Sequence, residues 1–342
     1  MMRPESSRAG FGHSAELVAF ASAYPQRVVT NDEYLQHVEF TPTDGWAQIS
    51  RESGFTERRW CNEQENCATL MLAAIEQLRD AYPEQVNQVD AVVVASGTTV
   101  PVVLPISTAN VAAADLAPLA LRHLHAKHAL GLDLKACYCT GFLRGLEVAD
   151  GLLASPHRRA VLVIAVEQGS KLAVARSNRS SFCFMVGDAA GAVIVRKASS
   201  NSGRGLIDHY GYTAPEYLDL VGIGEDARSL IMRGSKAAEA SHQLFVECGQ
   251  ALLSRNKLKP SDISWLLPLQ THRNLVARVA AALQWPEDRI IWDASALGFS
   301  GSASIPACLA DQVKRGAVRT GDSVLALAVG AGLNCAGALF RL

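Results

Sequence analysis

The sequence lacks any long apolar run. Stretches such as "AVLVIAV" (160–166) have the length of a strand and fall well short of the ~18 residues that a membrane-spanning helix needs. The first residues, "MMRPESSRAGFGHS", also lack the apolar segment of a secretory leader. We therefore expect no membrane partner and a cytoplasmic location.

An excess of charge of one sign is also lacking. The chain has 342 residues, of which 32 are Lys or Arg and 33 are Asp or Glu, so the net charge is −1. No basic face indicates a nucleic-acid partner, and we expect partners that are small or locally recognised. At about 100–200 residues per domain, the length suits two domains or two halves of one large domain.

Spacings typical of metal sites and phosphate loops are missing too. The eight cysteines favour reduced thiols over disulfides, and Cys61 and Cys67 lie too far apart for the usual paired zinc ligands. The histidines of "RHLHAKH" (122–128) have no cysteine beside them, and "GDAAGA" (187–192) lacks the Gly-Lys-Ser/Thr ending of a phosphate loop. We expect no metal and no permanently bound cofactor.

What the sequence does contain is a series of short runs rich in Val, Ile and Leu, separated by helical periods. We expect strands at 90–97, 160–169, 191–196, 263–269 and 323–332. Continuous apolar strands that alternate with helices are typical of sheets covered on both faces, so the pattern indicates an α/β fold.

Two segments of the chain also resemble each other. Residues 139–169 and 302–332 align without a gap at an offset of roughly 163 positions, far longer than the period of a solenoid. In each segment a small residue opens a helix, and a buried strand follows. We predict a duplicated architecture with halves near 1–199 and 200–342; the alternative is a chance likeness between two α/β segments.

Cys139 stands where an apolar run gives way to a helical pattern that includes Phe142 and Leu146. A helix N-terminus lowers the pKa of a cysteine toward neutrality, and its N–H groups can stabilise an oxyanion. We therefore predict that Cys139 is a nucleophile, although the pattern alone leaves a buried packing role equally open. Cys137, on the preceding strand, is expected to be a small buried hydrophobe.

Six segments, in this order along the chain, carry a resemblance to a known family: "AFASAYPQRVVTNDEYLQ", "TPTDGWAQISRESGFTERRW", "DAVVVASGTTVP", "ACYCTGF", "GDAAGA" and "GDSVLALAVGAGLNCAGALFRL". The sequence resembles β-ketoacyl-acyl-carrier-protein synthase III, a family of the thiolase superfamily, over nearly its whole length. The resemblance implies a thiolase-like α/β fold, whose duplicated halves give a layered α-β-α-β-α arrangement, and a homodimer. It also implies that Cys139 takes an acyl group from a thioester of coenzyme A or of an acyl carrier protein.

The family supplies a histidine to assist the cysteine, and we predict that His272 has this role. The register is displaced, because counting forward from the strand at 263–269 places Leu269 at the family's histidine position. Counting back from the next helix places Thr271 there, so His272 is reached only through a local insertion. The alternative is a loop histidine that caps a helix or faces water.

The family's asparagine position falls on Phe299, in "GFSGSAS". A phenyl ring cannot donate the hydrogen bond that stabilises an enolate during decarboxylation. Asn274 is predicted to replace the missing donor, with Ser300 as the alternative.

The second half-reaction therefore stays open. The resemblance favours a Claisen-type condensation with a carbon nucleophile, in fatty-acid or polyketide-type biosynthesis, whereas Phe299 favours acyl transfer to an amine or a hydroxyl. A partly degenerate subunit, paired with a catalytic paralogue as a heterodimer, is a third reading, against which the retained Cys139 argues.

Two more assignments follow from the resemblance. The family binds the adenine end of coenzyme A with a tryptophan and an arginine, which implies Trp46 and Arg51; a packed interfacial tryptophan is the alternative. Arg273 and Arg278 are candidates for docking an acidic carrier protein, unless they form an ordinary solvated helix face.

Overall fold

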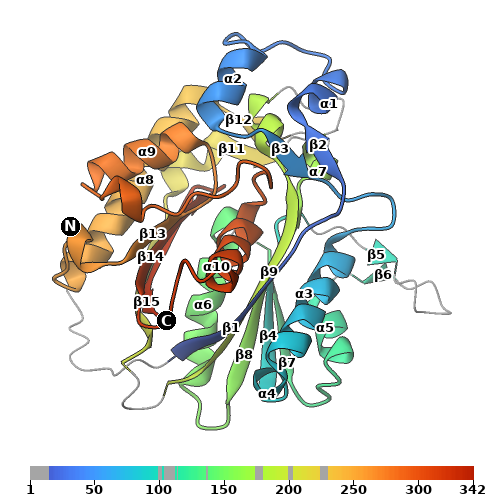
Figure 1. Cartoon of the computed structure of the whole chain (residues 1–342), viewed down its shortest axis with the longest axis vertical. Helices are drawn as coiled ribbons and strands as arrows, with labels where there is room; N and C mark the ends of the chain where they lie inside the picture. Colours follow the sequence, from blue (N-terminus) through green and yellow to red (C-terminus); the bar gives the residue numbers. More distant parts are fainter. Residues whose placement is uncertain are drawn as a thin grey trace.

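The computed structural model describes residues 15–98, 102–103, 112–113, 115–135, 138–173, 180–198, 203–223 and 230–342. Its frame consists of two sheets (Figure 1). The first has the strand order β1-β9-β8-β4-β7. Its strands are β1 (Ala15–Ala23), β4 (Val89–Ala95), β7 (Leu130–Leu134), β8 (Ala160–Gln168) and β9 (Asp188–Lys197). β4 runs parallel to both β7 and β8, and β9 runs antiparallel to β8 and β1.

The second sheet has the order β10-β15-β14-β13. Its strands are β10 (Gly205–Thr213), β13 (Trp265–Pro268), β14 (Ser323–Gly330) and β15 (Asn334–Arg341). β13 and β14 are parallel, whereas β15 runs antiparallel to β14 and β10. The five predicted strands correspond to β4, β8, β9, β13 and β14, so the predicted α/β class is confirmed.

Helices form three layers around the sheets (Figure 1). α3 (Cys67–Ala81) and α5 (Ala117–His123) cover the outer face of the first sheet, and α8 (Gly234–Arg255) covers the second sheet with α9 (Arg273–Ala282) packed against it. α6 (Gly141–Leu153) packs on β8 and β4, and α10 (Ser304–Lys314) packs on β9 and β1. These two helices lie between the sheets, which gives the layered α-β-α-β-α arrangement that the resemblance implied.

The remaining elements are short and lie at the ends of the strands. They are β2 (Val28–Thr30), α1 (Asn31–Gln36), α2 (Trp46–Ser53), β3 (Glu57–Arg59), α4 (Pro83–Val86), β5 (Val102–Val103), β6 (Ala112–Ala113), η1 (Tyr138–Thr140), α7 (Ser170–Ala173), η2 (Ser181–Met185), η3 (Pro215–Leu220), β11 (Val221–Ile223), β12 (Leu230–Met232), η4 (Pro260–Asp262), η5 (Glu287–Arg289) and η6 (Gly301–Ala303). In the part of the chain that the structure describes, no helix is long and apolar enough to cross a membrane.

The first sheet is buried on both faces, which explains its continuous apolar strands. Val92 and Leu162 belong to the cluster beneath α3, whereas Val93 and Val163 belong to the larger core between the sheets. Successive strand residues point to opposite faces, so a strand covered on both sides needs an apolar residue at each position.

The internal repeat is visible in the fold. α10 begins 163 residues after α6, and β14 begins 163 residues after β8. Close approach of α10 to the first sheet requires glycine at Gly191, because a Cβ there would lie 2.4 Å from the backbone nitrogen of Ala307. The strands of the first sheet come from residues 15–197 and those of the second from 205–341, and the halves near 1–199 and 200–342 stay a prediction.

Candidate active site

Cys139 lies in η1, the single 3-10 turn that follows β7 and leads directly into α6. Its side chain is half-buried, and Tyr138 before it has a φ of 39°, a backbone conformation that is uncommon for a residue other than glycine. The predicted position at a helix N-terminus is therefore confirmed, and α6 has no side-chain cap. Cys137 lies outside the described residues.

The equivalent turn of the second half faces η1. η6 contacts η1 and leads into α10, as η1 leads into α6. A Cβ on Gly141 would lie 3.2 Å from the Cβ of Ser302, so the two helix starts meet almost without a gap. Cys139 thus occupies a seam between the two repeats, and Ser302 is its counterpart across that seam.

Glu167 lies beneath this seam near the carboxyl end of β8, where its side chain is only 2% exposed. Its carboxylate accepts hydrogen bonds from the N–H groups of Gly97 (3.0 Å) and Thr98 (3.0 Å). The hydroxyls of Thr98 (2.6 Å) and Ser302 (2.5 Å) also donate to it. The sequence analysis did not single out this residue. The available signal was that Glu167 is the one charged residue in the apolar run 160–169.

The prediction that the helix N-terminus lowers the pKa of Cys139 is wrong. Burial and, to a smaller extent, the charge of Glu167 together raise the pKa of the Cys139 thiol to about 12, against a backbone hydrogen bond that lowers it. A thiolate in this seam loses its hydration and meets a second negative charge, and these effects outweigh the local donors.

His272 occupies the N-cap position of α9, half-buried, at the end of the loop that follows β13. Burial lowers the pKa of His272, and the nearby carboxylate of Glu52, on α2, opposes that effect. Within the described part of the chain no hydrogen bond joins His272 to Cys139. The structure therefore brings Cys139 together with Ser302 and Glu167, and it brings His272 together with α2.

Apolar side chains occupy the positions at which the sequence alignment expected polar ones. Leu269 is 3% exposed and its N–H donates to Leu327 of β14 (2.7 Å). Phe299 is 5% exposed, and its ring meets that of Phe182 edge to face, with 5.2 Å between centroids. Neither side chain can donate a hydrogen bond.

The two candidate replacements for the asparagine differ in exposure. Asn274 is exposed on the first turn of α9, whereas Ser300 is 4% exposed beside η6. Ser300 also precedes Ser302, the residue at the seam, by only two positions in the sequence.

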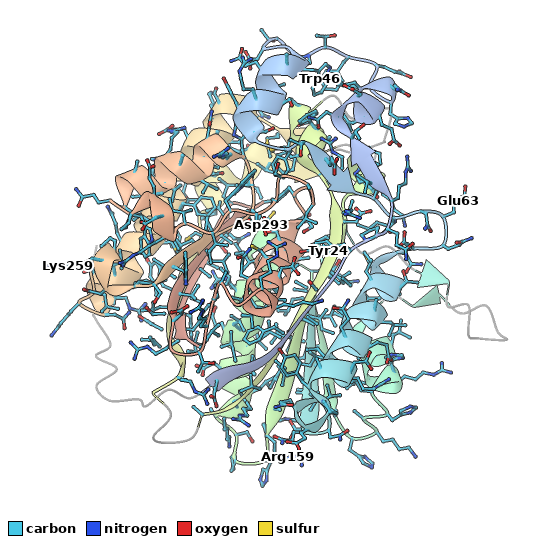
Figure 2. All side chains as sticks on the ribbon, viewed as in Figure 1. Tyr24, Trp46, Glu63, Arg159, Lys259 and Asp293 are labelled. Atoms are coloured by element: carbon cyan, nitrogen blue, oxygen red, sulfur yellow. The ribbon has the colours of Figure 1, made fainter. Side chains whose placement is uncertain are left out.

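Trp46 begins α2 and is half-buried (Figure 2). Its ring stacks on Phe184 at 5.7 Å, meets Tyr34 edge to face, and its Nε1 donates to the carbonyl of Phe40 (3.2 Å). Arg51, in the last turn of the same helix, is exposed. The two residues predicted to bind coenzyme A thus share one helix, and one face of the indole is already used for packing.

Arg273 and Arg278 lie on α9 and are both exposed. The Arg273 guanidinium lies over Trp292, 5.8 Å from the ring centroid, and Arg278 forms an ion pair with Glu239 (2.7 Å). Of these two arginines, Arg278 is paired with a carboxylate in the structure's described residues, whereas Arg273 forms no ion pair there.

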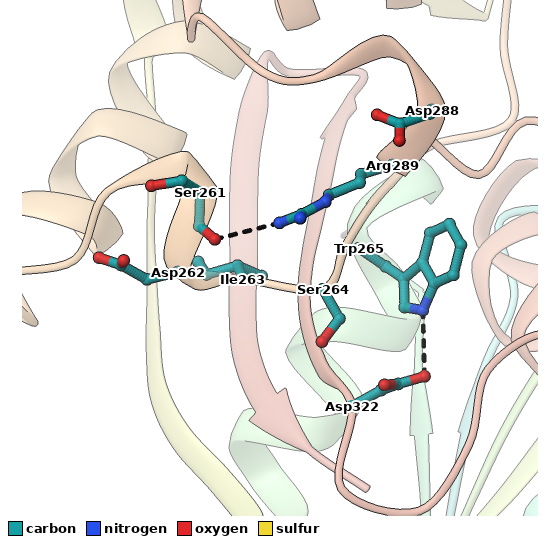
Figure 3. Close-up of a pocket in the computed structure, with 8 residues that line it drawn as sticks. All are labelled: Ser261, Asp262, Ile263, Ser264, Trp265, Asp288, Arg289 and Asp322. Atoms are coloured by element: carbon teal, nitrogen blue, oxygen red, sulfur yellow. Dashed lines mark hydrogen bonds between the residues drawn. The ribbon is translucent and has the colours of Figure 1, made fainter.

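A surface pocket of about 380 Å³ lies at the amino ends of β13 and β14 (Figure 3). Its polar groups satisfy one another, because Trp265 Nε1 donates to Asp322 (3.1 Å) and Arg289 donates to the carbonyl of Ser261 (3.0 Å). The His272 loop follows the opposite, carboxyl end of β13. This pocket is therefore separate from the candidate site. Among the described residues no group of His, Cys, Asp and Glu is arranged to hold a metal ion.

Known proteins resemble this chain over nearly its full length. The family described as "3-Oxoacyl-[acyl-carrier-protein (ACP)] synthase III" matches residues 132–212, and the family of its C-terminal part matches residues 253–342. The β-ketoacyl-[acyl-carrier-protein] synthase III of Granulibacter bethesdensis is 28% identical over 335 residues, which cover 95% of this chain and 99% of that protein.

Solved structures show the same fold. The 3-oxoacyl-[acyl-carrier-protein] synthase III of Aquifex aeolicus superposes with a TM-score of 0.84 at 25% identity and covers 96% of this chain and 100% of its own. The priming β-ketosynthase of the R1128 polyketide pathway has a TM-score of 0.84 at 24% identity, with 99% of both chains covered. At this level of identity, the likeness to the priming β-ketosynthase shows a shared fold only.

Proposed function

This chain belongs to the 3-oxoacyl-[acyl-carrier-protein] synthase III family, and we propose that it is an acyltransferase that carries its acyl group on Cys139. The observation that carries the proposal is the position of Cys139 at the start of α6, in the seam between the two repeats. N–H groups at a helix start can stabilise the oxyanion that forms when a thioester is attacked.

In the loading step the Cys139 sulfur, as a thiolate, attacks the carbonyl carbon of an acyl thioester. The carrier thiol leaves with a proton, and the acyl group stays on Cys139 as a new thioester. Coenzyme A and the phosphopantetheine arm of an acyl carrier protein are the proposed donors. No permanently bound cofactor takes part in this chemistry.

α2 is the proposed binding place for the adenine end of coenzyme A. Trp46 would offer the exposed part of its half-buried indole and Arg51 an exposed guanidinium at the end of the same helix. An acidic carrier protein would dock beside it at Arg273, because α9 contacts α2 and Arg278 is already paired with Glu239.

For the second half-reaction the apolar pair Leu269 and Phe299 favours acyl transfer without decarboxylation. A decarboxylating condensation develops negative charge on an enolate oxygen, and the loss of one donor to such an oxygen costs ~2.7–4 kcal/mol. The acceptor that fits these surroundings is an amine, a hydroxyl or a carbon nucleophile that is already activated, with His272 or Asn274 assisting from the start of α9.

Claisen-type condensation with a malonyl thioester, in fatty-acid or polyketide-type biosynthesis, is the second candidate, and family membership favours it. A degenerate subunit that supports a catalytic paralogue is disfavoured, because such a subunit would not need a thiol at Cys139.

The proposed assembly is a homodimer through β7. Among the described strands, β7 pairs on one side only, with β4, and its apolar residues Leu130, Leu132 and Leu134 are half-buried. An unpaired apolar edge is a ready surface for a strand of a second copy. We also place the protein in the cytoplasm, because the cysteines among the described residues are all free thiols.

Product analysis with an acyl-coenzyme A donor, with and without malonyl carrier protein, tests the acceptor class. Transfer to an amine or hydroxyl without release of carbon dioxide supports the proposal. Release of carbon dioxide in step with a β-keto product supports condensation instead. Cys139→Ala is the control, and it should remove either product.

A further inference from the structure

Glu167 is a buried carboxyl group that the proposed reaction does not use. The donors that surround it come from both repeats: Gly97 and Thr98 follow β4 of the first sheet, and Ser302 belongs to η6 of the second half. In the described ranges no Lys, Arg or His forms an ion pair with Glu167, and the partners seen there are hydrogen-bond donors from Gly97, Thr98 and Ser302. Burial raises the pKa of the Glu167 carboxyl even though each of these hydrogen bonds lowers it.

The carboxyl group and the nucleophile share one seam. Glu167 Cγ lies 3.2 Å from the position that a Cβ on Gly301 would take, so the carboxylate packs directly beneath η6. η6 in turn packs against η1, which holds Cys139. The charge of Glu167 reaches the Cys139 thiol and raises its pKa. Two acids in a dry space oppose each other's ionisation.

In the described parts of the chain, the charged side chains on the elements that pack most closely against η1 have partners of their own or are exposed. η1 packs against β14, η6, α6 and β15, and neither β14 nor η6 carries an ionisable side chain. On α6, Arg144 donates to Glu147 and to the carbonyl of Cys335 of β15, and Glu147 and Asp150 face His209. Arg341, also on β15, is exposed.

In the described residues, Glu167 also acts on the thiol of Cys67, which Asp188 and Lys171 affect as well. Burial and the charge of Glu167 together raise the pKa of Cys67 to about 12, so the thiol stays neutral. Asp188 accepts from the N–H groups of Cys61 (2.7 Å) and Ser170 (2.8 Å). The charge of Lys171 lowers the pKa of Cys67. The ring of Tyr138 packs against Gly97.

We propose that Glu167 and Cys139 form a coupled acid pair that holds a single negative charge, so that Glu167 is protonated whenever the Cys139 thiolate exists. The two forms of the pair are a thiol with a carboxylate and a thiolate with a carboxylic acid; both hold one proton and one negative charge. The hydrogen bonds from Ser302 and Thr98 favour the form with a carboxylate on Glu167 and a neutral thiol on Cys139. Glu167 therefore acts through Cys139 and not on the substrate. Its charge sets how readily the Cys139 thiol ionises.

The inference rests on the proposed role of Cys139 as the nucleophile, but its test needs no acyl donor. The rate at which iodoacetamide alkylates Cys139, read on the Cys139 peptide by mass spectrometry between pH 7 and 9, reports the amount of thiolate. For each unit by which the pKa of a thiol falls, about tenfold more thiolate forms, and its intrinsic nucleophilicity falls about threefold. Glu167→Gln keeps the shape and removes the charge, so we expect alkylation of Cys139 at least about threefold faster.

The matched control is Asp188→Asn, which neutralises a buried carboxylate whose charge is not among those that act on Cys139. This variant should leave the alkylation rate unchanged. An unchanged or slower rate in folded Glu167→Gln overturns the proposal, and so does an equal acceleration in both variants. If Cys139 shows the expected alkylation but no acyl adduct with any thioester, the proposed function fails while the acid pair stands.

A second measurement needs only the unaltered protein. Iodoacetate carries a negative charge and iodoacetamide does not, and both attack the same thiolate. Under the proposal the reacting thiolate always has a protonated Glu167 beside it, so the ratio of the iodoacetamide rate to the iodoacetate rate at Cys139 should stay constant as the pH rises. A ratio that increases with pH at Cys139, but not at a small free thiol treated in parallel, would show a thiolate beside a carboxylate and contradicts the proposal.

Discussion

The Ser302 hydroxyl donates a hydrogen bond to the Glu167 carboxylate although the two residues lie 135 positions apart in the chain. The bond joins η6 in the second half to the end of β8 in the first, beneath the turn that holds Cys139. Cys139 therefore lies above a polar clasp, the Ser302–Glu167 hydrogen bond, which both repeats must fold to complete.

This clasp predicts a stability loss in Ser302→Ala. The variant leaves the buried Glu167 with one donor fewer, and a buried charged group that loses a partner costs ~1–3 kcal/mol. Urea unfolding at pH 7 should show this loss in the free energy of unfolding. Ser254→Ala, at an exposed position of α8, is the matched control and should stay within about 0.5 kcal/mol. Equal values for the two variants would refute the clasp.

Restoring polar groups at the two apolar positions should open the decarboxylating route. We expect Leu269→His combined with Phe299→Asn to release carbon dioxide from malonyl carrier protein faster than the unaltered protein, because an enolate donor returns to the site. One such donor is worth about 10²–10³-fold in rate where its geometry is right. Leu269→Met combined with Phe299→Leu keeps the pair apolar and should show no gain. A gain in this control would mean that space, not hydrogen bonding, limits decarboxylation.

His272 predicts a specific pH dependence of stability. Burial lowers the pKa of folded His272 below its ordinary value of 6.5, so the unfolded chain binds the proton more readily. As the pH falls through 6.5, His272 therefore costs stability, and the cost is complete below the folded pKa. Relative to His272→Gln, the unaltered protein should lose free energy of unfolding between pH 7 and pH 5. A difference that is independent of pH would show that His272 is not desolvated.

Much of the frame could be predicted from the sequence, because its signals are local. The continuous apolar runs marked β4, β8 and β14, and the gapless repeat marked the equivalent starts of α6 and α10. The position of Cys139 followed from the change of period at residue 139. These features depend on residues a few positions apart.

The charge environment of the site could not be predicted in this way. The seam forms from segments that are far apart in the chain, so neither the Ser302 donor to Glu167 nor the stack of Trp46 on Phe184 leaves a local pattern. For the same reason the pKa of Cys139 was expected to fall, whereas burial between the repeats and the charge of Glu167 raise it. The dipole of α6 was visible in the sequence, but the desolvation that outweighs it was not.

The most direct test of the account is intact-protein and peptide mass spectrometry after incubation with a panel of acyl-coenzyme A and acyl-carrier thioesters. We predict that one or more donors leave an acyl adduct on the Cys139 peptide and that Cys139→Ala carries none. Absence of an adduct on Cys139 with every donor, or an equal adduct in Cys139→Ala, would contradict the claim that Cys139 is the acyl carrier.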